Sequence, residues 1–184
     1  MSVPAFEPVR ELRLLYAFFG DSALPEIESV DAVDVPQPYH NLLVHRHHMT
    51  VTLEKYHGKP VTVVPWRVQR NGDIYGRKLD LIVEPGKVVM TGVMLINFGF
   101  CSKAVQEEVV AETAPLGRIL IEHKVLRRID ATAFVRLPAG DALVQRFKLP
   151  KAMPAYGRLA TIYCDEKPAI DLLEIVAPED GAES

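Results

Sequence analysis

The most constraining feature of this sequence is a pair of turn signals that separates three runs of strand-forming residues. Asn71-Gly72 lies between residues 61–69 and 73–83, and Pro85-Gly86 lies between 73–83 and 87–98. Asn-Gly is the favoured two-residue turn of a β-hairpin, and Pro-Gly suits a type II turn. The chain therefore predicts an antiparallel meander in this region.

The second half of the chain also contains strand-forming runs that are separated by turn residues. Two more hairpins are expected, one around a Pro-Ala-Gly-Asp turn and one around Asp165-Glu166-Lys167, with strands at 127–137, 143–149, 156–163 and 168–176. Proline cannot donate a ladder hydrogen bond, so Pro65 places the first strand of the meander at an edge or a bulge. These patterns predict about six strands.

Three segments have helical character. Apolar residues recur at three- and four-residue steps over 42–56, between Pro38 and Gly58, which predicts an amphipathic helix of about four turns. Residues 102–112 start with a capping serine and are rich in helix formers, and 115–123 predict a further short helix. The expected fold class is α+β, a single antiparallel sheet with helices covering one face.

The chain length of 184 residues suits one domain, 1–184, that buries roughly 70% of its unfolded surface. Residues 1–38 are expected to form an N-terminal extension that packs on the domain, and 177–184 to form a disordered tail. A core of this size needs no disulfide, so the two cysteines are expected to be inert buried thiols.

Charge and hydropathy exclude several classes of function. The net charge is −3 and no basic block occurs, which argues against a nucleic-acid surface. No apolar run reaches the roughly 20 residues of a bilayer span, and the N-terminus lacks a secretory signal. We therefore expect a cytoplasmic protein without a membrane-spanning segment.

Two charged residues fall on the apolar face of their predicted strands. Arg77 shares its parity with Tyr75, Leu79 and Leu81, and Glu174 alternates in the same way with the apolar residues of the last strand. Burying a charge is costly unless the charge is paired. The two side chains therefore predict either an ion pair or a polar ligand site, unless the register of one strand is shifted by a residue.

Other polar residues leave alternatives open. Arg158 shares its strand parity with Ala160 and Ile162, and it is expected either to contact a ligand or to pair with a nearby acid. The run His45-Arg46-His47-His48 invites a metal site, but no acidic ligand lies at helical spacing. We expect no bound metal and solvated or hydrogen-bonding roles for most of the histidines.

Several short motifs follow one another in an order that resembles a known family. Leu-Leu-Val-His-Arg-His-His-Met-Thr at 42–50 is followed by Tyr75-Gly76-Arg77, then Pro-Leu-Gly-Arg at 115–118, then Tyr156-Gly157-Arg158 and Leu172-Leu173-Glu174. This ordered set, spread over about residues 40–178, resembles a divergent branch of the chorismate pyruvate-lyases, the 4-hydroxybenzoate synthases.

The resemblance implies a chorismate lyase-like fold with an internal pocket beneath two helical flaps and no cofactor or metal. It implies conversion of chorismate to 4-hydroxybenzoate and pyruvate. Arg77 would hold a substrate carboxylate and Glu174 would face the ring hydroxyl, as the catalytic pair. Met49, Leu116 and Gly117 would contact the substrate.

Chorismate carries a second carboxylate, and Arg158 or Arg128 is expected to neutralise it. Aromatisation of the ring drives the reaction, so the protein must supply a fixed conformation and matched charge. The resemblance gives no oligomeric state and does not identify the pathway that uses the product.

Two other classes of function remain open. Non-catalytic effector-binding domains of regulators use the same fold, so the chain is alternatively a binding module for a small aromatic acid. A hot-dog thioesterase or dehydratase would wrap its sheet around a long central helix, and the many predicted hairpins fit that arrangement less well.

Overall fold

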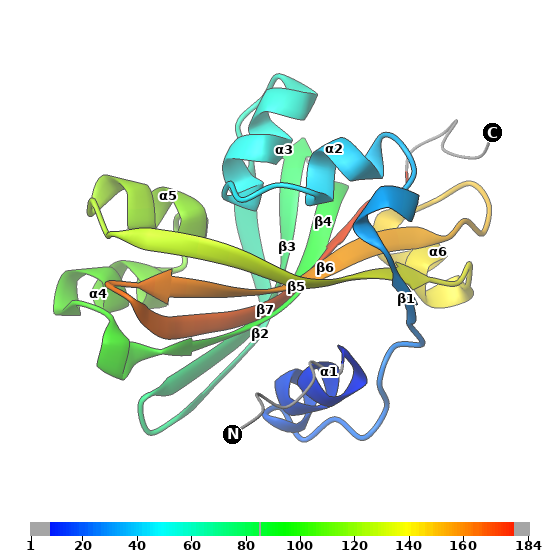
Figure 1. Cartoon of the computed structure of the whole chain (residues 1–184). Helices are drawn as coiled ribbons and strands as arrows, with labels where there is room; N and C mark the ends of the chain where they lie inside the picture. The colour runs from blue at the N-terminus through cyan, green and yellow to red at the C-terminus, as the bar shows by residue number, and fades with distance from the viewer. Residues whose placement is uncertain (1–7, 85, 179–184) are drawn as a thin grey trace.

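The computed structural model describes residues 8–84 and 86–178 and contains one seven-stranded antiparallel sheet, confirming the predicted α+β class (Figure 1). The strand order is β1-β5-β6-β7-β4-β3-β2. The strands are β1 (Glu28–Val30), β2 (Thr62–Asn71), β3 (Ile74–Glu84), β4 (Lys87–Asn97), β5 (Arg127–Leu137), β6 (Ala155–Cys164) and β7 (Lys167–Val176). The helices are α1 (Pro8–Ala17), η1 (Ala32–Asp34), α2 (Tyr39–Leu43), α3 (Met49–His57), η2 (Phe98–Phe100), α4 (Lys103–Ala111), α5 (Leu116–Glu122) and α6 (Asp141–Phe147).

The predicted meander is present as β2, β3 and β4. Asn71 still pairs with Ile74, so the first turn consists of Gly72 and Asp73, one position later than the Asn-Gly signal suggested. Gly72 and Gly86 have φ of +57° and +81°, a region that glycine enters without steric cost. β2 is an edge strand, and its register shifts between Pro65 and Arg67, as the proline predicted.

One predicted strand is wrong. Residues 143–149 belong largely to α6, which buries Leu143 and Phe147, four residues apart on one face. β5 pairs with β6 along one side, and β1 occupies the other side at Phe134–Arg136, next to the turn from which a hairpin strand at 143–149 would have to start. The spacing of two buried residues fits a helix that lies on the sheet.

The prediction of one continuous helix over 42–56 is also wrong. This segment is divided into α2 and α3 by residues 44–48, and Val44 leaves the helical region with ψ of 72°. His48 is the N-cap of α3, and Gly58 ends that helix in the left-handed conformation. The reason for the interruption is a buried arginine on β6, described below.

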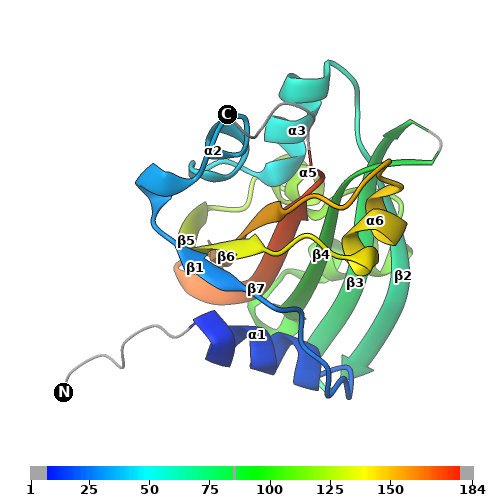
Figure 2. The same cartoon turned by 90° about the vertical axis from the view of Figure 1, so that its right-hand side faces the viewer.

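Helices pack on both faces of the sheet (Figure 2). The larger core lies beneath α2, α3, α4 and α5 and includes Leu79, Met94 and Leu172 from three adjacent strands. The smaller core lies on the opposite face, between the sheet and the helices α1 and α6. The sequence predicted helices on one face, and the second layer comes from the N-terminal segment and from α6.

The N-terminal segment is tied to the sheet by charge as well as by apolar contact. Leu12 and Leu15 of α1 are buried, and Asp21 forms ion pairs with Arg67 and Lys78 of the meander. Of the tail expected at 177–184, residues 179–184 lie outside the described residues, as do 1–7 of the N-terminal extension. Among the described helices, none is long and apolar enough to cross a membrane.

Gly157 of β6 is packed tightly against the backbone of β7. A methyl group added there would lie 2.5 Å from the backbone oxygen of Glu174, whereas one added at Gly140 would meet nothing closer than 4.0 Å. We expect Gly157→Ala to lower the free energy of unfolding by about 2–3 kcal/mol, because backbone cannot move aside cheaply. Gly140→Ala, the control, should cost less than about 1 kcal/mol. Urea denaturation measures both, and equal effects would contradict the close packing at Gly157.

Candidate functional site

A small internal cavity lies between the sheet and the N-terminal ends of α3 and α5. Its volume is about 30 Å³, which is room for on the order of one water molecule. The polar side chains that line it are those of His48, Thr50, Arg77 and Glu174. Its apolar lining comes from the strands and the two helices: Met49, Val63, Leu79, Leu81, Met90, Met94, Pro115, Leu116, Ile162 and Leu172.

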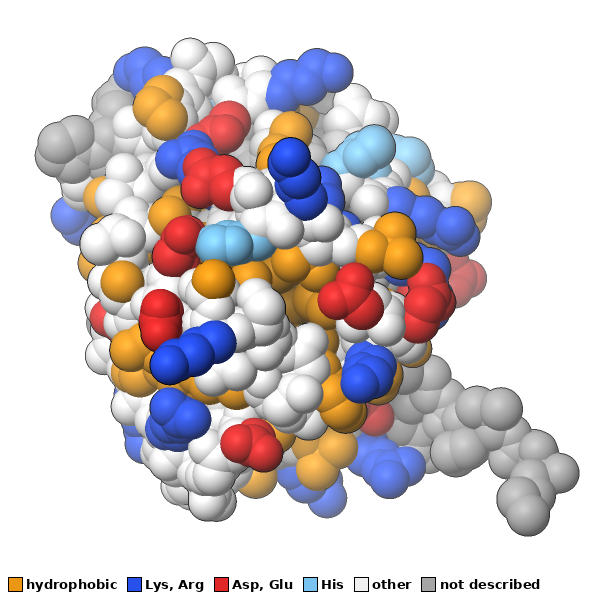
Figure 3. Space-filling view, turned by 90° about the vertical axis from the view of Figure 1, so that its left-hand side faces the viewer, with side chains coloured by type: hydrophobic (Ala, Val, Ile, Leu, Met, Phe, Trp, Pro, Cys, Tyr) orange, Lys and Arg blue, Asp and Glu red, His pale blue; other side chains and the backbone are white. Residues whose placement is uncertain are grey.

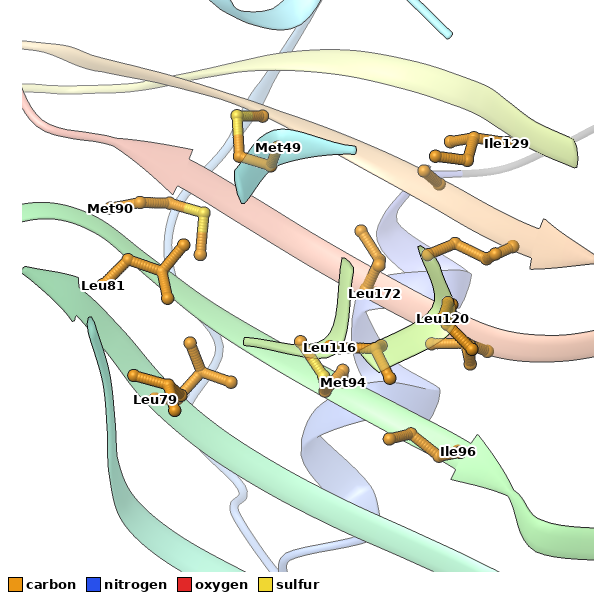
Figure 4. Packing of buried hydrophobic residues seen from close by; sticks show 14 of the residues in the cluster. Met49, Leu79, Leu81, Met90, Met94, Ile96, Leu116, Leu120, Ile129 and Leu172 are labelled. Carbon is orange, nitrogen blue, oxygen red and sulfur yellow. The ribbon is translucent and has the colours of Figure 1, made fainter. Parts of the chain in front are cut away.

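Figure 4 shows how the apolar walls meet. Met49 and Leu116 come from the helices, and they lie over the sheet residues Met90, Met94 and Leu172. Three of these five residues are methionines, whose flexible side chains can change shape with little cost. The small volume of the cavity can therefore increase by side-chain movement alone.

The two helices above the cavity are held against each other. Gly117 at the start of α5 lies so close to α3 that an added methyl group would be 2.9 Å from Cβ of His48. Arg118 of α5 forms an ion pair with Glu54 of α3. Glu54 also accepts a hydrogen bond from the backbone N–H of Val61 at 3.0 Å. Together, α3 and α5 close the cavity on the side away from the sheet.

Arg77 is the most unusual residue of the cavity. Its side chain projects from β3 onto the face of the larger core, as strand alternation predicted, and its exposed fraction is 0%. None of its three side-chain nitrogens has a hydrogen-bond partner within the described residues. Burial lowers the pKa of the guanidinium, while Tyr75 and Glu112 nearby oppose that shift. A guanidinium stays protonated even so, which makes this a buried cation without a hydrogen-bonded anion in the part of the chain that the structure describes.

Glu174 does not pair with Arg77. The sheet registers place Arg77 opposite Met94 and Glu174 opposite Gly92, on strands separated by β4. Glu174 instead accepts a hydrogen bond from Nε of Arg158 at 2.7 Å, across the β6–β7 ladder. The alternatives that the sequence left open are thus resolved: Arg158 is the ion-pair partner of Glu174, and it does not line the cavity.

Each nitrogen of the Arg158 guanidinium has a hydrogen-bond partner. Its terminal nitrogens donate to the backbone oxygens of Leu43, His45 and His47 at 3.3, 3.1 and 3.3 Å. These carbonyls can face Arg158 only because the chain leaves the helical conformation between α2 and α3. The buried arginine is therefore the physical reason for the interrupted helix.

His48 was not predicted as a site residue, because the sequence placed it inside an amphipathic helix and gave most of the histidines solvated or hydrogen-bonding roles. It is 6% exposed, and its Nε2 atom has no hydrogen-bond partner within the described residues. Burial, together with Arg127, Arg158 and His47, lowers its pKa to about 4. The imidazole is therefore neutral at pH 7. The one sequence feature that could have indicated its role is its position immediately before Met49, which was expected to contact the substrate.

The structure places Arg128 away from the cavity, so it does not join Arg77. Its guanidinium is exposed, pairs with Asp130 and lies over the ring of Tyr163. It lines a surface groove between α3, α5 and β5 that His48 also reaches. On the face drawn in Figure 3, at the α4 and α5 end of the molecule, acidic and basic side chains are interspersed.

Comparison with known proteins gives a likeness only among solved structures. No family model and no curated protein matches the chain. The gene product SA0254 from Staphylococcus aureus superposes with a TM-score of 0.51 at 10% identity, over 73% of this chain and 90% of that one. PhnF from Mycobacterium smegmatis gives 0.51 and 10%, over 74% and 66%.

A third structure, described as the ligand-binding domain of a GntR-family transcriptional regulator from Bordetella bronchiseptica, gives a TM-score of 0.47 at 13% identity, over 63% of this chain and 85% of that one. The likeness is one of fold. The chorismate lyase-like architecture implied by the sequence motifs is confirmed, whereas membership of the lyase family is not shown.

Removing the charge of Arg158 and removing the charge of Arg77 should have different effects on the free energy of unfolding. Arg158→Met leaves Glu174 unpaired in the core, and we expect it to lower the free energy of unfolding by about 3–5 kcal/mol. Arg77→Met removes an unpaired buried charge, so it should leave stability unchanged or raise it by about 1–2 kcal/mol. Urea denaturation without added ligand measures both. A large loss of stability in Arg77→Met would contradict the absence of partners at that residue.

The low pKa of His48 predicts acid sensitivity. Its pKa is about 4 in the folded state against 6.5 for the ordinary value, so between these pH values the unfolded chain binds more protons. Its contribution is complete above pH 6.5 and is lost as the pH falls towards 4. The loss due to His48 at pH 5 should be about 2 kcal/mol relative to pH 7.5. It is measured by urea denaturation as the part of the pH dependence that a His48 variant lacks, because His45, whose pKa is also lowered to about 4, adds a loss of its own. His48→Gln should reduce the difference between the two pH values, and an unchanged difference would contradict the assignment.

Proposed function

We propose that this protein binds a small aromatic carboxylate, of which 4-hydroxybenzoate is the simplest example, in the cavity beneath α3 and α5. The observation that carries the proposal is Arg77, a wholly buried guanidinium without a hydrogen-bond partner among the described residues. A guanidinium presents paired donors that match the two oxygens of a carboxylate. A bound carboxylate would satisfy donors that the described residues leave unpaired.

The other walls suit the rest of such a ligand. The apolar side chains of Met49, Leu116 and Leu172 can contact the faces of an aromatic ring and exclude water. Glu174 lines the cavity two strands away from Arg77, about 10 Å across the sheet. A carboxylate at one end of the ring and a hydroxyl donor at the other would match this arrangement.

Binding requires the cavity to expand, because its volume of about 30 Å³ is smaller than an aromatic acid. Met49, Met90 and Met94 are the side chains best able to move. The ion pair between Arg118 and Glu54 holds the two helices together at a partly exposed position, where such pairs contribute little to stability. Separation of α3 from α5 would also expose apolar residues of the larger core, such as Leu53 and Ile119, so movement of the methionine side chains is the less costly way to enlarge the cavity.

A second candidate function is the conversion of chorismate to 4-hydroxybenzoate and pyruvate. What favours it is that Arg77 and Glu174, the catalytic pair implied by the sequence motifs, line the same cavity. In this reaction Arg77 would hold a carboxylate of the substrate, and Glu174 would face the ring hydroxyl. Arg158 would keep the Glu174 carboxylate oriented, and the closed helices would exclude water from the ether that is cleaved.

The test measures binding and turnover in the same preparation. Titration calorimetry with 4-hydroxybenzoate should show saturable binding in the unmodified protein. Arg77→Met should weaken it by roughly 100-fold or more, because the carboxylate then enters an apolar cavity without its counter-ion. Arg128→Ala is the matched control, since that arginine is exposed and lies outside the cavity, and its affinity should stay within about twofold.

Incubation with chorismate distinguishes the two candidates. Equal amounts of pyruvate and 4-hydroxybenzoate, lost in Arg77→Met and reduced in Glu174→Gln, would establish the lyase. Saturable binding of 4-hydroxybenzoate without turnover would establish a binding module. Neither binding nor turnover, or full binding by Arg77→Met, would overturn the proposal.

A further inference from the structure

His48 is a third polar group of the cavity, and neither candidate function gives it a role. It differs from Arg77 and Glu174 in its origin, because it comes from the helical layer while they come from the sheet. It precedes α3 as the N-cap residue, and its backbone oxygen accepts from the backbone N–H of Thr52 at 3.2 Å. Its side chain makes no hydrogen bond that caps the helix.

The position of the imidazole is fixed by packing. Cβ and Cγ of His48 lie against Gly117, where only a hydrogen in place of a side chain leaves room for the ring. Thr50 lies in the same contact, 3.0 Å from the point that a methyl group on Gly117 would occupy. Because residues of both helices hold the ring in place, it has little freedom to rotate towards another hydrogen-bond partner.

Burial of the Nε2 atom of His48 costs free energy, and packing alone does not explain why this cost is tolerated. The atom is buried without a hydrogen-bond partner in the described part of the chain, and a buried polar atom left unpaired is unfavourable. The ring is neutral at pH 7, since its pKa is about 4. A neutral imidazole offers one donor and one acceptor nitrogen, and Nε2 takes either role according to the tautomer.

We propose that His48 determines ligand specificity by hydrogen bonding, through Nε2, to a third polar substituent on the aromatic acid. This inference rests on the proposed function and extends it from a hydroxybenzoate to a ring that bears a further oxygen substituent. A hydroxyl group both donates and accepts, so it satisfies Nε2 in either tautomer. The favoured ligand class is therefore a dihydroxylated benzoate, with its second hydroxyl directed towards α3 and α5.

The placement of the three polar groups supports this class over a simple hydroxybenzoate. Arg77 and Glu174 project from two strands of the floor and suit the carboxylate and the para hydroxyl. His48 comes from the helical layer and not from the sheet, and its buried Nε2 atom has no hydrogen-bond partner within the described residues, so it can serve a substituent that Arg77 and Glu174 do not hold. A site built to hydrogen-bond a hydroxyl discriminates against the analogue that lacks it, because a buried polar atom is then left unpaired.

The experiment compares three probes by titration calorimetry: 4-hydroxybenzoate, 3,4-dihydroxybenzoate and 2,4-dihydroxybenzoate. In the unmodified protein one of the two dihydroxylated probes should bind about three- to tenfold more tightly than 4-hydroxybenzoate. His48→Leu should abolish this preference while leaving the affinity for 4-hydroxybenzoate within about threefold. His48→Gln, which keeps a side chain able to donate and accept, should retain part of the preference.

The outcomes separate this inference from the function on which it rests. If no probe binds, the proposed function fails. If 4-hydroxybenzoate binds through Arg77 but neither second hydroxyl improves affinity, or the preference persists in His48→Leu, the role of His48 is wrong and the carboxylate site stands. Urea denaturation of both variants serves as the control that the protein remains folded.

Discussion

The ion pair between Arg158 and Glu174 is the interaction on which the architecture of the cavity depends. It joins neighbouring strands in the centre of the sheet. The same guanidinium donates hydrogen bonds to backbone oxygens at the end of α2 and in the segment between α2 and α3. A cation buried in this way must have its donors satisfied, because the desolvation cost is otherwise several kcal/mol. The helix is interrupted to meet that requirement, and α3 consequently starts at the edge of the cavity with His48 and Met49 at its first positions.

The two buried arginines differ in their hydrogen-bond partners, and this difference distinguishes a structural arginine, Arg158, from a candidate binding residue, Arg77. Arg158 has a carboxylate and three carbonyl oxygens around it, whereas Arg77 has no partner among the described residues, although both are almost completely buried. Stability alone would not maintain an unpaired guanidinium, because an apolar residue of similar volume would cost less. Destabilising polar groups of this kind are characteristic of binding sites, where the ligand supplies the missing partner.

The lid and the floor of the cavity contribute differently to binding. The contact between α3 and α5 combines buried apolar residues, the close approach at Gly117 and one partly exposed ion pair. The floor is a continuous ladder of long strands with apolar residues on both faces. The floor positions Arg77 and Glu174, and the flexible methionine side chains that line the cavity can change its shape without disturbing the sheet.

The sequence by itself determined the meander, the edge position of Pro65 and the inward faces of Arg77 and Glu174. These depend on local rules: turn residues with restricted backbone conformations, and the two-residue period of a strand. Only the tertiary structure decided that Glu174 pairs with Arg158, that residues 143–149 are helical and that His48 enters the cavity. Each of these depends on which strands are neighbours in the sheet and on which buried groups must share partners, and local periodicity carries no information about either.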